Sequence, residues 1–276
     1  MKKALLILFI WAGLVRGTMS QEVIAMNENL NFQSEKEKAF WNLGDSDPFL
    51  LFRAVQADQN NLDDVWDNLV QDLDIKALKK KNEYKFLRQI FEKTHQRILR
   101  KYEQHSTFNS MLQEGKFDCV SGSAALGLLL DRYGFAFEIV ETDYHVFIIA
   151  QADGRKVILE STLPIGGFIA NTSEVEKYLD SYKPAEFAQL KSLNQRLAGT
   201  DLDYSDNSIF RKVNLKQLAG LQYYNDAIVH FNTQAFDLAI YQLSKAYTLY
   251  QSDRILRLRE LSIDMAYKTF GYELKK

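Results

Sequence analysis

Hydrophobic and polar positions repeat with a helical period over two long stretches of the chain. Between residues 83 and 102, apolar side chains recur every three or four positions, and lysine and arginine occupy the other face. This pattern predicts an amphipathic helix whose basic face is solvated. Residues 119–133 are small or apolar on nearly every face, and Gly134 follows them. They predict a central helix that other elements approach closely and that the glycine ends.

The period changes to two after this helix. Strands are expected at residues 135–141, 144–150 and 156–160, and the Asp-Gly pair at 153–154 is typical of a hairpin turn. A buried helix that leads into at least three antiparallel strands indicates an α+β fold, with the helix packed on the sheet.

The hairpin also fixes which residues face each other. A turn at 153–154 pairs residues whose numbers add up to about 307, so His145 is expected opposite Thr162 and Glu160 opposite Phe147. Glu160 would then be a diagonal neighbour of His145, within reach of a long side chain.

Further helices are expected before and after this core. An acidic cap and Pro48 indicate a helix over 48–56, and another begins near residue 61. Ser173 and Glu176 form a possible capping box for a helix that ends at Tyr182. A further helix is expected over 184–197.

Two boundaries divide the chain. Residues 1–20 have a basic start and a short apolar run, which predicts a cleaved signal peptide and an exported, periplasmic or secreted protein without stable membrane insertion. An uncleaved anchor is the alternative, although the run is shorter than the about 20 residues that span a bilayer comfortably. The polar stretch 198–208 is expected to separate a domain over 21–200 from a helical segment over 205–276.

The segment 205–276 is expected to hold paired helices. Asn214 and Gln217 predict a capping box, and the small and aromatic residues that follow resemble one tetratricopeptide unit of about 34 residues. A single unit cannot bury its own faces, so it should pack on the first domain. It could also bind a protein partner.

Charge and composition exclude several classes of function. The formal net charge is −2, which gives no electrostatic reason to expect nucleic acid or an anionic membrane as a partner. With one cysteine and four scattered histidines, a metal site is improbable, and no motif indicates a cofactor. The basic residues of 83–102, with His95 and His105, are interpreted as ordinary surface or packing residues.

The single cysteine, Cys119, has no partner for an intramolecular disulfide. A lone thiol in an exported chain is a reactive group, an intermolecular bridge or a small buried hydrophobe. Asp118 is expected to cap the helix that begins at Cys119, and a helix N-terminus favours thiolate and lowers the thiol pKa. His145 could act as the base for this thiol, and Glu160 could orient the imidazole ring.

Three motifs carry a family resemblance: DCVSGSAAL at 118–126, YHVF at 144–147 and LEST at 159–162. Together they resemble the core of the transglutaminase-like superfamily, over roughly residues 107–167. The resemblance implies a papain-like core and acyl transfer through a thioester. It also implies that Cys119 is the nucleophile, His145 the base and Glu160 the orienting acid, where an aspartate is common.

The same resemblance raises the question of what stabilises the oxyanion. The Cys119 backbone N–H would supply one donor. Gln113, six residues earlier, is a candidate for the second, and the alternative is that it is an ordinary polar residue of a connector.

The sequence therefore predicts a cysteine hydrolase or acyltransferase that acts on a peptide or isopeptide amide of a peptide or protein substrate. A catalytically inactive relative that binds peptides is the main alternative. A structural component of an envelope assembly is a third.

Overall fold

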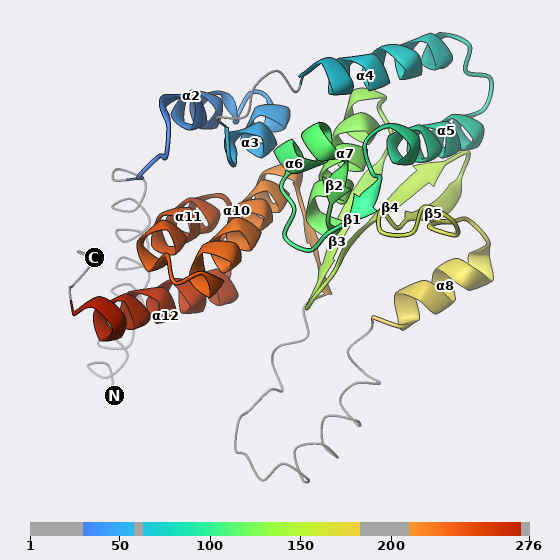
Figure 1. Cartoon of the computed structure of the whole chain (residues 1–276). Coiled ribbons are helices and arrows are strands. Elements are labelled where there is room, and N and C mark those ends of the chain that lie inside the picture. Colours follow the sequence, from blue (N-terminus) through green and yellow to red (C-terminus); the bar gives the residue numbers. More distant parts are fainter. Residues whose placement is uncertain (1–29, 58–62, 183–209, 272–276) are drawn as a thin grey trace, which may run out of the picture.

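A computed structural model describes residues 30–57, 63–182 and 210–271 (Figure 1). The expected signal peptide at 1–20, the expected helix over 184–197 and the expected linker at 198–208 lie outside these ranges. Within them, no helix is both long and apolar enough to cross a bilayer. The described residues form an α+β fold with a five-stranded antiparallel sheet, which confirms the predicted class.

The sheet has the strand order β6-β5-β4-β3-β7. Its strands are β3 (Phe137–Thr142), β4 (Val146–Ala152), β5 (Arg155–Leu159), β6 (Phe168–Ile169) and β7 (Phe210–Val213). The edge strand β7 belongs to the segment expected as a separate helical unit, yet it pairs with β3.

The register of the central hairpin follows the predicted rule. Ala152 pairs with Arg155, and Ile148 pairs with Leu159, so paired numbers add up to 307. The turn residues Asp153 and Gly154 have φ values of 49° and 73°, the left-handed conformation that a two-residue hairpin turn requires. Strand β4 begins at Val146, so His145 lies just before the strand and not within it.

The central helix is α7 (Cys119–Arg132), which packs on β3 and β4. Asp118 caps its start in a capping box with Ser121, and Gly134 follows its end with a φ of 70°. Ten of its fourteen residues are buried, as the small and apolar pattern predicts.

Seven elements precede α7 in the described part of the chain. They are α2 (Glu35–Leu43), α3 (Pro48–Ala54), α4 (Asp63–Leu78), α5 (Glu83–Arg97), β1 (Lys101–Tyr102), α6 (Phe108–Glu114) and β2 (Lys116–Phe117). Helix α5 lies beside α7 on one face of the sheet (Figure 1). The other face is covered by α8 (Thr172–Asp180), which packs against β5.

Alternation along β4 separates these two layers. Val146, Ile148 and Ala150 belong to the large core beneath α7. Phe147 and Ile149 belong to a smaller core with residues of α8. Successive residues of β4 therefore face two different cores.

The cap predicted for α8 is wrong by two residues. The side chain of Asn171, and not that of Ser173, accepts hydrogen bonds from the free N–H groups at the start of the helix. Asparagine is at least as good an N-cap as serine. Asn171 has the extended backbone conformation of an N-cap, with φ −71° and ψ 128°, and the helix therefore begins after it.

The chain ends in three packed helices, α10 (Leu215–Asn232), α11 (Phe236–Leu249) and α12 (Asp253–Phe270). Helix α10 begins with the predicted capping box of Asn214 and Gln217. It packs against α3 and α7, as a single helical unit that cannot bury its own faces should.

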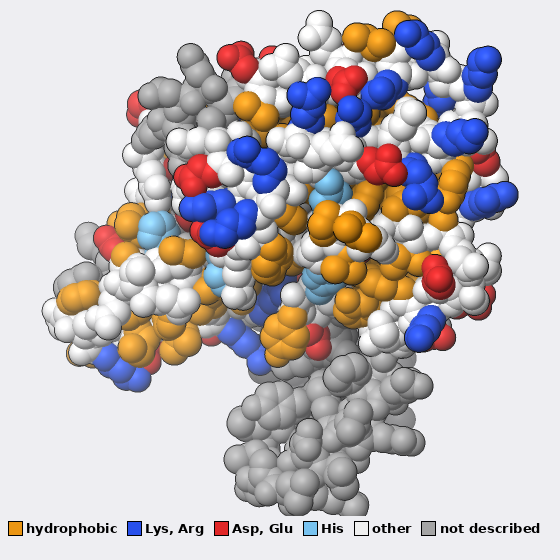
Figure 2. Space-filling model, turned by 45° about the vertical axis from the view of Figure 1, so that its right-hand side comes forward, with side chains coloured by type: hydrophobic (Ala, Val, Ile, Leu, Met, Phe, Trp, Pro, Cys, Tyr) orange, Lys and Arg blue, Asp and Glu red, His pale blue; other side chains and the backbone are white. Residues whose placement is uncertain are grey.

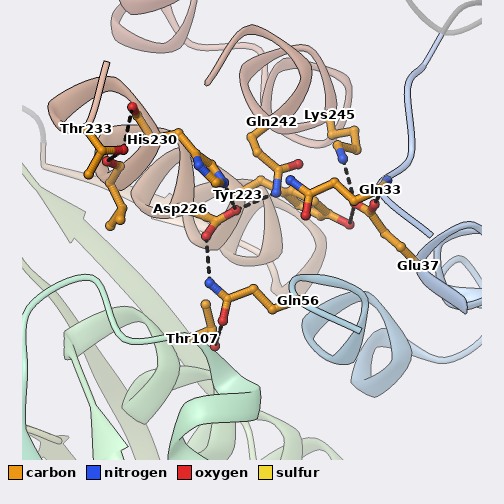
Figure 3. Close-up of polar contacts among 11 residues, drawn as sticks. Gln33, Glu37, Gln56, Thr107, Tyr223, Asp226, His230, Thr233, Gln242 and Lys245 are labelled. Carbon is orange, nitrogen blue, oxygen red and sulfur yellow. Dashed lines mark hydrogen bonds and ion pairs between the residues drawn. The ribbon is translucent and has the colours of Figure 1, made fainter. Parts of the chain in front are cut away.

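A buried polar network joins these helices to the start of the described chain (Figure 3). It consists of Glu37, Tyr223, Asp226, Gln242 and Lys245. The Lys245 ammonium lies 2.5 Å from Glu37 Oε1, and Tyr223 donates to the same oxygen at 3.2 Å. Asp226 accepts from the Gln242 amide and from Gln56, the latter at 3.0 Å.

Candidate functional site

A histidine and a glutamate meet where the ends of β4 and β5 lie side by side. The Nε2 atom of His145 lies 2.5 Å from Glu160 Oε2. His145 precedes β4 and Glu160 follows β5, so the hairpin register brings the two side chains together. The Glu160 side chain is 3 % exposed and that of His145 is 20 % exposed, so the imidazole is the member that meets solvent.

His145 is not the only residue that forms a hydrogen bond with the Glu160 carboxylate. Its Oε1 atom accepts from the backbone N–H of Thr162 at 2.9 Å and from the Thr162 hydroxyl at 2.6 Å. Its Oε2 atom also accepts from the hydroxyl of Tyr178 on α8. Burial opposes the charged form, but the bonds from His145, Thr162 and Tyr178 outweigh it and hold the pKa of Glu160 below its usual value. We call these four residues the histidine–glutamate cluster.

Aromatic rings from α8 and the residues after it cover the imidazole. The ring of Tyr182 is stacked on His145, with centroids 6.1 Å apart and planes at 19°. Phe147 contacts both Tyr178 and Tyr182. These contacts restrict the orientation of the His145 ring in addition to its bond with Glu160.

Cys119 is the first residue of α7, at the end of the helix that points towards this cluster. Helix α7 approaches β4 closely, since the Ser123 hydroxyl donates to the Val146 carbonyl at 3.3 Å. It also approaches the end of β5, where a Cβ on Gly122 would come within 2.8 Å of the Ser161 hydroxyl oxygen. Glycine at 122 therefore allows the cysteine end of the helix to lie against the residues that carry His145 and Glu160.

Cys119 and His145 line the same cavity, which has a volume of about 780 Å³. One wall comes from the core, including Val120, Tyr144 and Val146. The opposite wall comes from the C-terminal helices and consists of Leu221, Tyr224, Asn225, Ile228, Asp253, Arg254 and Arg257. Figure 2 shows a hollow between these two parts, with histidine and hydrophobic side chains at its edges.

The C-terminal helices also touch the cap of α7. The Asn225 amide donates to Asp118 Oδ2 at 2.8 Å, while Asp118 Oδ1 accepts from the Ser121 backbone at 2.8 Å. The start of the cysteine helix is therefore held from both the core and α10.

The expected effect of the helix start on the thiol is not observed. Burial raises the pKa of Cys119 to about 12, and the charge of Asp118 adds to the rise. A hydrogen bond with the Val146 backbone lowers the pKa, but by less than burial raises it. The prediction of a lowered pKa is therefore wrong for the isolated thiol, because desolvation outweighs the helix dipole.

The structure places Gln113 away from the cysteine. Its side chain is exposed on α6, and it is not among the residues that line the cavity. Gln104 and His105, which follow β1, do line it. Gln113 is closer to Cys119 in sequence than Gln104 and His105 are, but not in space. Strands β1 and β2 are parallel neighbours, so the residues that follow β1 reach the start of α7.

Some residues of this site were not predicted. His105 was interpreted as an ordinary residue, but it lines the cavity with a φ of 63°, an uncommon backbone conformation for a side-chain-bearing residue. Tyr178 is distant in sequence from Cys119, and its helical spacing alone gives no sign of a bond to Glu160. His95 is a buried packing residue, as interpreted from the sequence.

The described residues contain no group of three or more histidine, cysteine or acidic side chains that could hold a metal ion. Comparisons with protein-family models, curated proteins and solved structures give no match. The functional argument therefore rests on the geometry of the site.

Proposed function

We propose that this protein is an exported, transglutaminase-like cysteine hydrolase or acyltransferase that acts on peptide or isopeptide amides. The observation that carries the proposal is the bond between His145 and the buried Glu160, at a cavity that Cys119 also lines. A thiol and an imidazole that line one cavity, with a buried carboxylate bonded to the imidazole, are the groups that acyl transfer through a thioester needs.

In the proposed reaction, His145 takes the proton of the Cys119 thiol. The bond to Glu160 occupies Nε2, which leaves Nδ1 as the ring nitrogen for this transfer. The sulfur then attacks the carbonyl carbon of the amide, and the C=O electrons move to the oxygen. The Cys119 backbone N–H, which has no partner within the helix because it is in the first turn, supports this oxyanion.

The tetrahedral intermediate collapses when the imidazolium gives its proton to the leaving amine. A thioester between Cys119 and the acyl group remains, and water or a second amine attacks it with His145 as the base. Because burial disfavours a free thiolate, the negative sulfur forms together with the positive imidazolium. The anionic Glu160 lowers the cost of that ion pair.

Thiol alkylation over a range of pH tests this proposal. We expect iodoacetamide to label Cys119 with a rate that forms a plateau near neutral pH, because an imidazolium pairs with the thiolate. His145→Ala should remove the plateau and lower the rate at pH 7 by about 100-fold, which is typical of general-base removal. Mass spectrometry of the intact chain gives the rate, and Cys119→Ser is the unlabelled control.

The opposite result is equally clear. If labelling of the native protein increases steadily with pH towards the thiol pKa of about 12, and His145→Ala does not change it, the proposal is wrong. Thermal unfolding of each variant shows whether the site is still folded.

A second candidate is a peptide-binding protein that keeps this fold without catalysis. The raised pKa of the Cys119 thiol favours it, because an inert buried cysteine has this property. This candidate predicts slow labelling of Cys119 together with binding of peptides in the cavity, which is unchanged in Cys119→Ser.

A further inference from the structure

An exposed apolar tip lies between α4 and α5, far from the candidate site. Leu78 is 89 % exposed and Ile75, one turn earlier on α4, is 51 % exposed. Three consecutive lysines, Lys79, Lys80 and Lys81, follow directly and are exposed. The tip thus combines two exposed apolar side chains with three adjoining cations.

A second basic segment lies against this tip. The turn of the β4–β5 hairpin approaches the start of α5, where the Tyr84 backbone N–H donates to Asp153 Oδ2 at 3.1 Å. The guanidinium of Arg155 lies 5.7 Å from the centre of the Tyr84 ring. The hairpin thereby adds Arg155 to the lysines of the α4–α5 connection.

We call this surface the basic tip. It comprises Ile75, Leu78, Lys79, Lys80, Lys81, Lys85, Arg88 and Arg155. Six of these eight residues are cations, and the carboxylates within the two segments 79–88 and 153–155 are Glu83 and Asp153. Across the described residues, no carboxylate lies within ion-pair distance of Lys79, Lys81 or Lys85. The charge is concentrated here although the chain as a whole has a net charge of −2.

We propose that the basic tip binds peripherally to an anionic phospholipid surface. The lysines would lie at the level of the phosphate groups, and Leu78 would enter the boundary between headgroups and acyl chains. Anionic lipids attract each basic residue near the surface, and the apolar side chain adds a contribution that does not depend on charge.

The exposed leucine favours a lipid surface over a dissolved polyanion. Phosphates of a nucleic acid or of a free polyphosphate would pair with the lysines but would leave Leu78 and Ile75 in water. A bilayer surface offers both an anionic layer and an apolar layer within a few ångströms. The net charge of the whole chain gave no reason to expect such a partner. It sums all charges, whereas the fold brings the cations of the basic tip together on one surface.

The basic tip and the cavity lie at opposite ends of α7. Lys80 contacts the ring of Phe135, just beyond the C-terminal end of α7, whereas Cys119 is the first residue of this helix. A helix of 14 residues is about 20 Å long. Binding through the basic tip would therefore hold the cavity away from the lipid surface and leave it open.

Vesicle flotation tests the proposal with the full chain. The probes are vesicles of phosphatidylcholine alone and vesicles that also contain phosphatidylglycerol. We expect binding to the anionic vesicles that weakens with added salt. Lys79→Gln combined with Lys81→Gln should weaken it about 25-fold, or about fivefold per lysine. Binding to the neutral vesicles measures the contribution that does not depend on charge, which is that of Leu78 together with any from the apolar residues 4–15.

Leu78→Ser should weaken binding to the anionic vesicles about tenfold, because the apolar contact is lost. Matched controls on α2 are Leu43→Ser, another exposed leucine, and Lys36→Gln combined with Lys38→Gln. These controls should bind as the native chain does. None of the variants should change the alkylation of Cys119, so this test is independent of the proposed reaction.

Three results would overturn the proposal. One is an absence of binding to anionic vesicles at low salt, and another is equal weakening by Leu78→Ser and Leu43→Ser. The third is binding that the lysine variants weaken while Leu78→Ser leaves it unchanged. That pattern, together with binding to soluble polyphosphate, would assign the surface to a dissolved polyanion.

Discussion

The histidine–glutamate cluster and the buried polar network are built from similar parts and differ in their access to solvent. Each contains a buried carboxylate that accepts several hydrogen bonds, with a cationic or titratable partner within 2.5 Å. In the network of Figure 3, both Lys245 and Glu37 are almost completely enclosed. In the cluster, the His145 ring is partly exposed and lines a cavity. Similar chemistry therefore holds the helices together in one place and is open to solvent in the other.

The largest expected effect comes from breaking the enclosed pair. Lys245→Met would leave Glu37 buried without its cation, which typically costs about 3–5 kcal/mol of the free energy of unfolding. Chemical denaturation measures this loss. Combining it with Glu37→Leu should recover much of the stability, because two apolar residues remove the unpaired charge.

Lys245→Met also tests whether the buried polar network and the histidine–glutamate cluster are independent of each other. In the fraction of Lys245→Met that remains folded, the rate of Cys119 alkylation should equal that of the native chain. A large change in that rate at low temperature, where the variant is folded, would contradict the separation and show that the network supports the site.

Much of the candidate site could be predicted from local sequence. The cap at Asp118, the end of α7 near Gly134 and the register of the β4–β5 hairpin depend on residues within a few positions of each other. Because a hairpin turn fixes every pair along its strands, the meeting of His145 and Glu160 follows from the Asp-Gly turn at 153–154.

The rest depends on contacts between distant segments. Tyr178 reaches Glu160 because α8 folds across the sheet, and the cavity wall from α10 and α12 exists because these helices pack beside α7. Neither contact leaves a periodic signal. The pKa of Cys119 was misjudged for the same reason, since burial is a property of the assembled fold and the helix start alone does not reveal it.

A second prediction compares two histidines by pH. Burial lowers the pKa of His95 from 6.5 to about 4. Because the folded pKa is below the unfolded one, His95 contributes stability above pH 6.5 that is lost as the pH falls towards 4. The full loss is about 3 kcal/mol at 1.36 kcal/mol per pKa unit. His95→Leu should remove this part of the acid sensitivity, which denaturation at a series of pH values measures.

His230 should behave in the opposite way, because its bond to Asp226 in the buried polar network raises its pKa. Its contribution is complete below the unfolded pKa of about 6.5 and is lost as the pH rises through the folded pKa. His230→Gln should therefore lose stability on the acid side of that window and little on the alkaline side. Equal pH profiles for the His95 and His230 variants would contradict both assignments.

The smallest expected effect is that of Tyr178→Phe. It tests the candidate site directly, and the prediction rests on the proposed reaction. Tyr178→Phe keeps the ring that packs on Phe147 and removes the hydroxyl that donates to Glu160. With one donor fewer, the pKa of Glu160 should rise, so the carboxylate is ionised over a narrower range of pH, and it is held less firmly beside the imidazole. We expect the plateau of Cys119 alkylation to fall about tenfold, or about 1.4 kcal/mol, and its acid limb to move to higher pH.

Tyr133→Phe is the matched control for this positioning role. It removes a hydroxyl that donates to Asp74 at 2.9 Å, far from the cavity. Loss of this bond should lower the free energy of unfolding by about 1 kcal/mol, as loss of the Tyr178 hydroxyl should. The alkylation profile of Tyr133→Phe should not move. If both tyrosine variants change stability alike and neither moves the acid limb, the Tyr178 hydroxyl is part of the packing of α8 and does not tune Glu160.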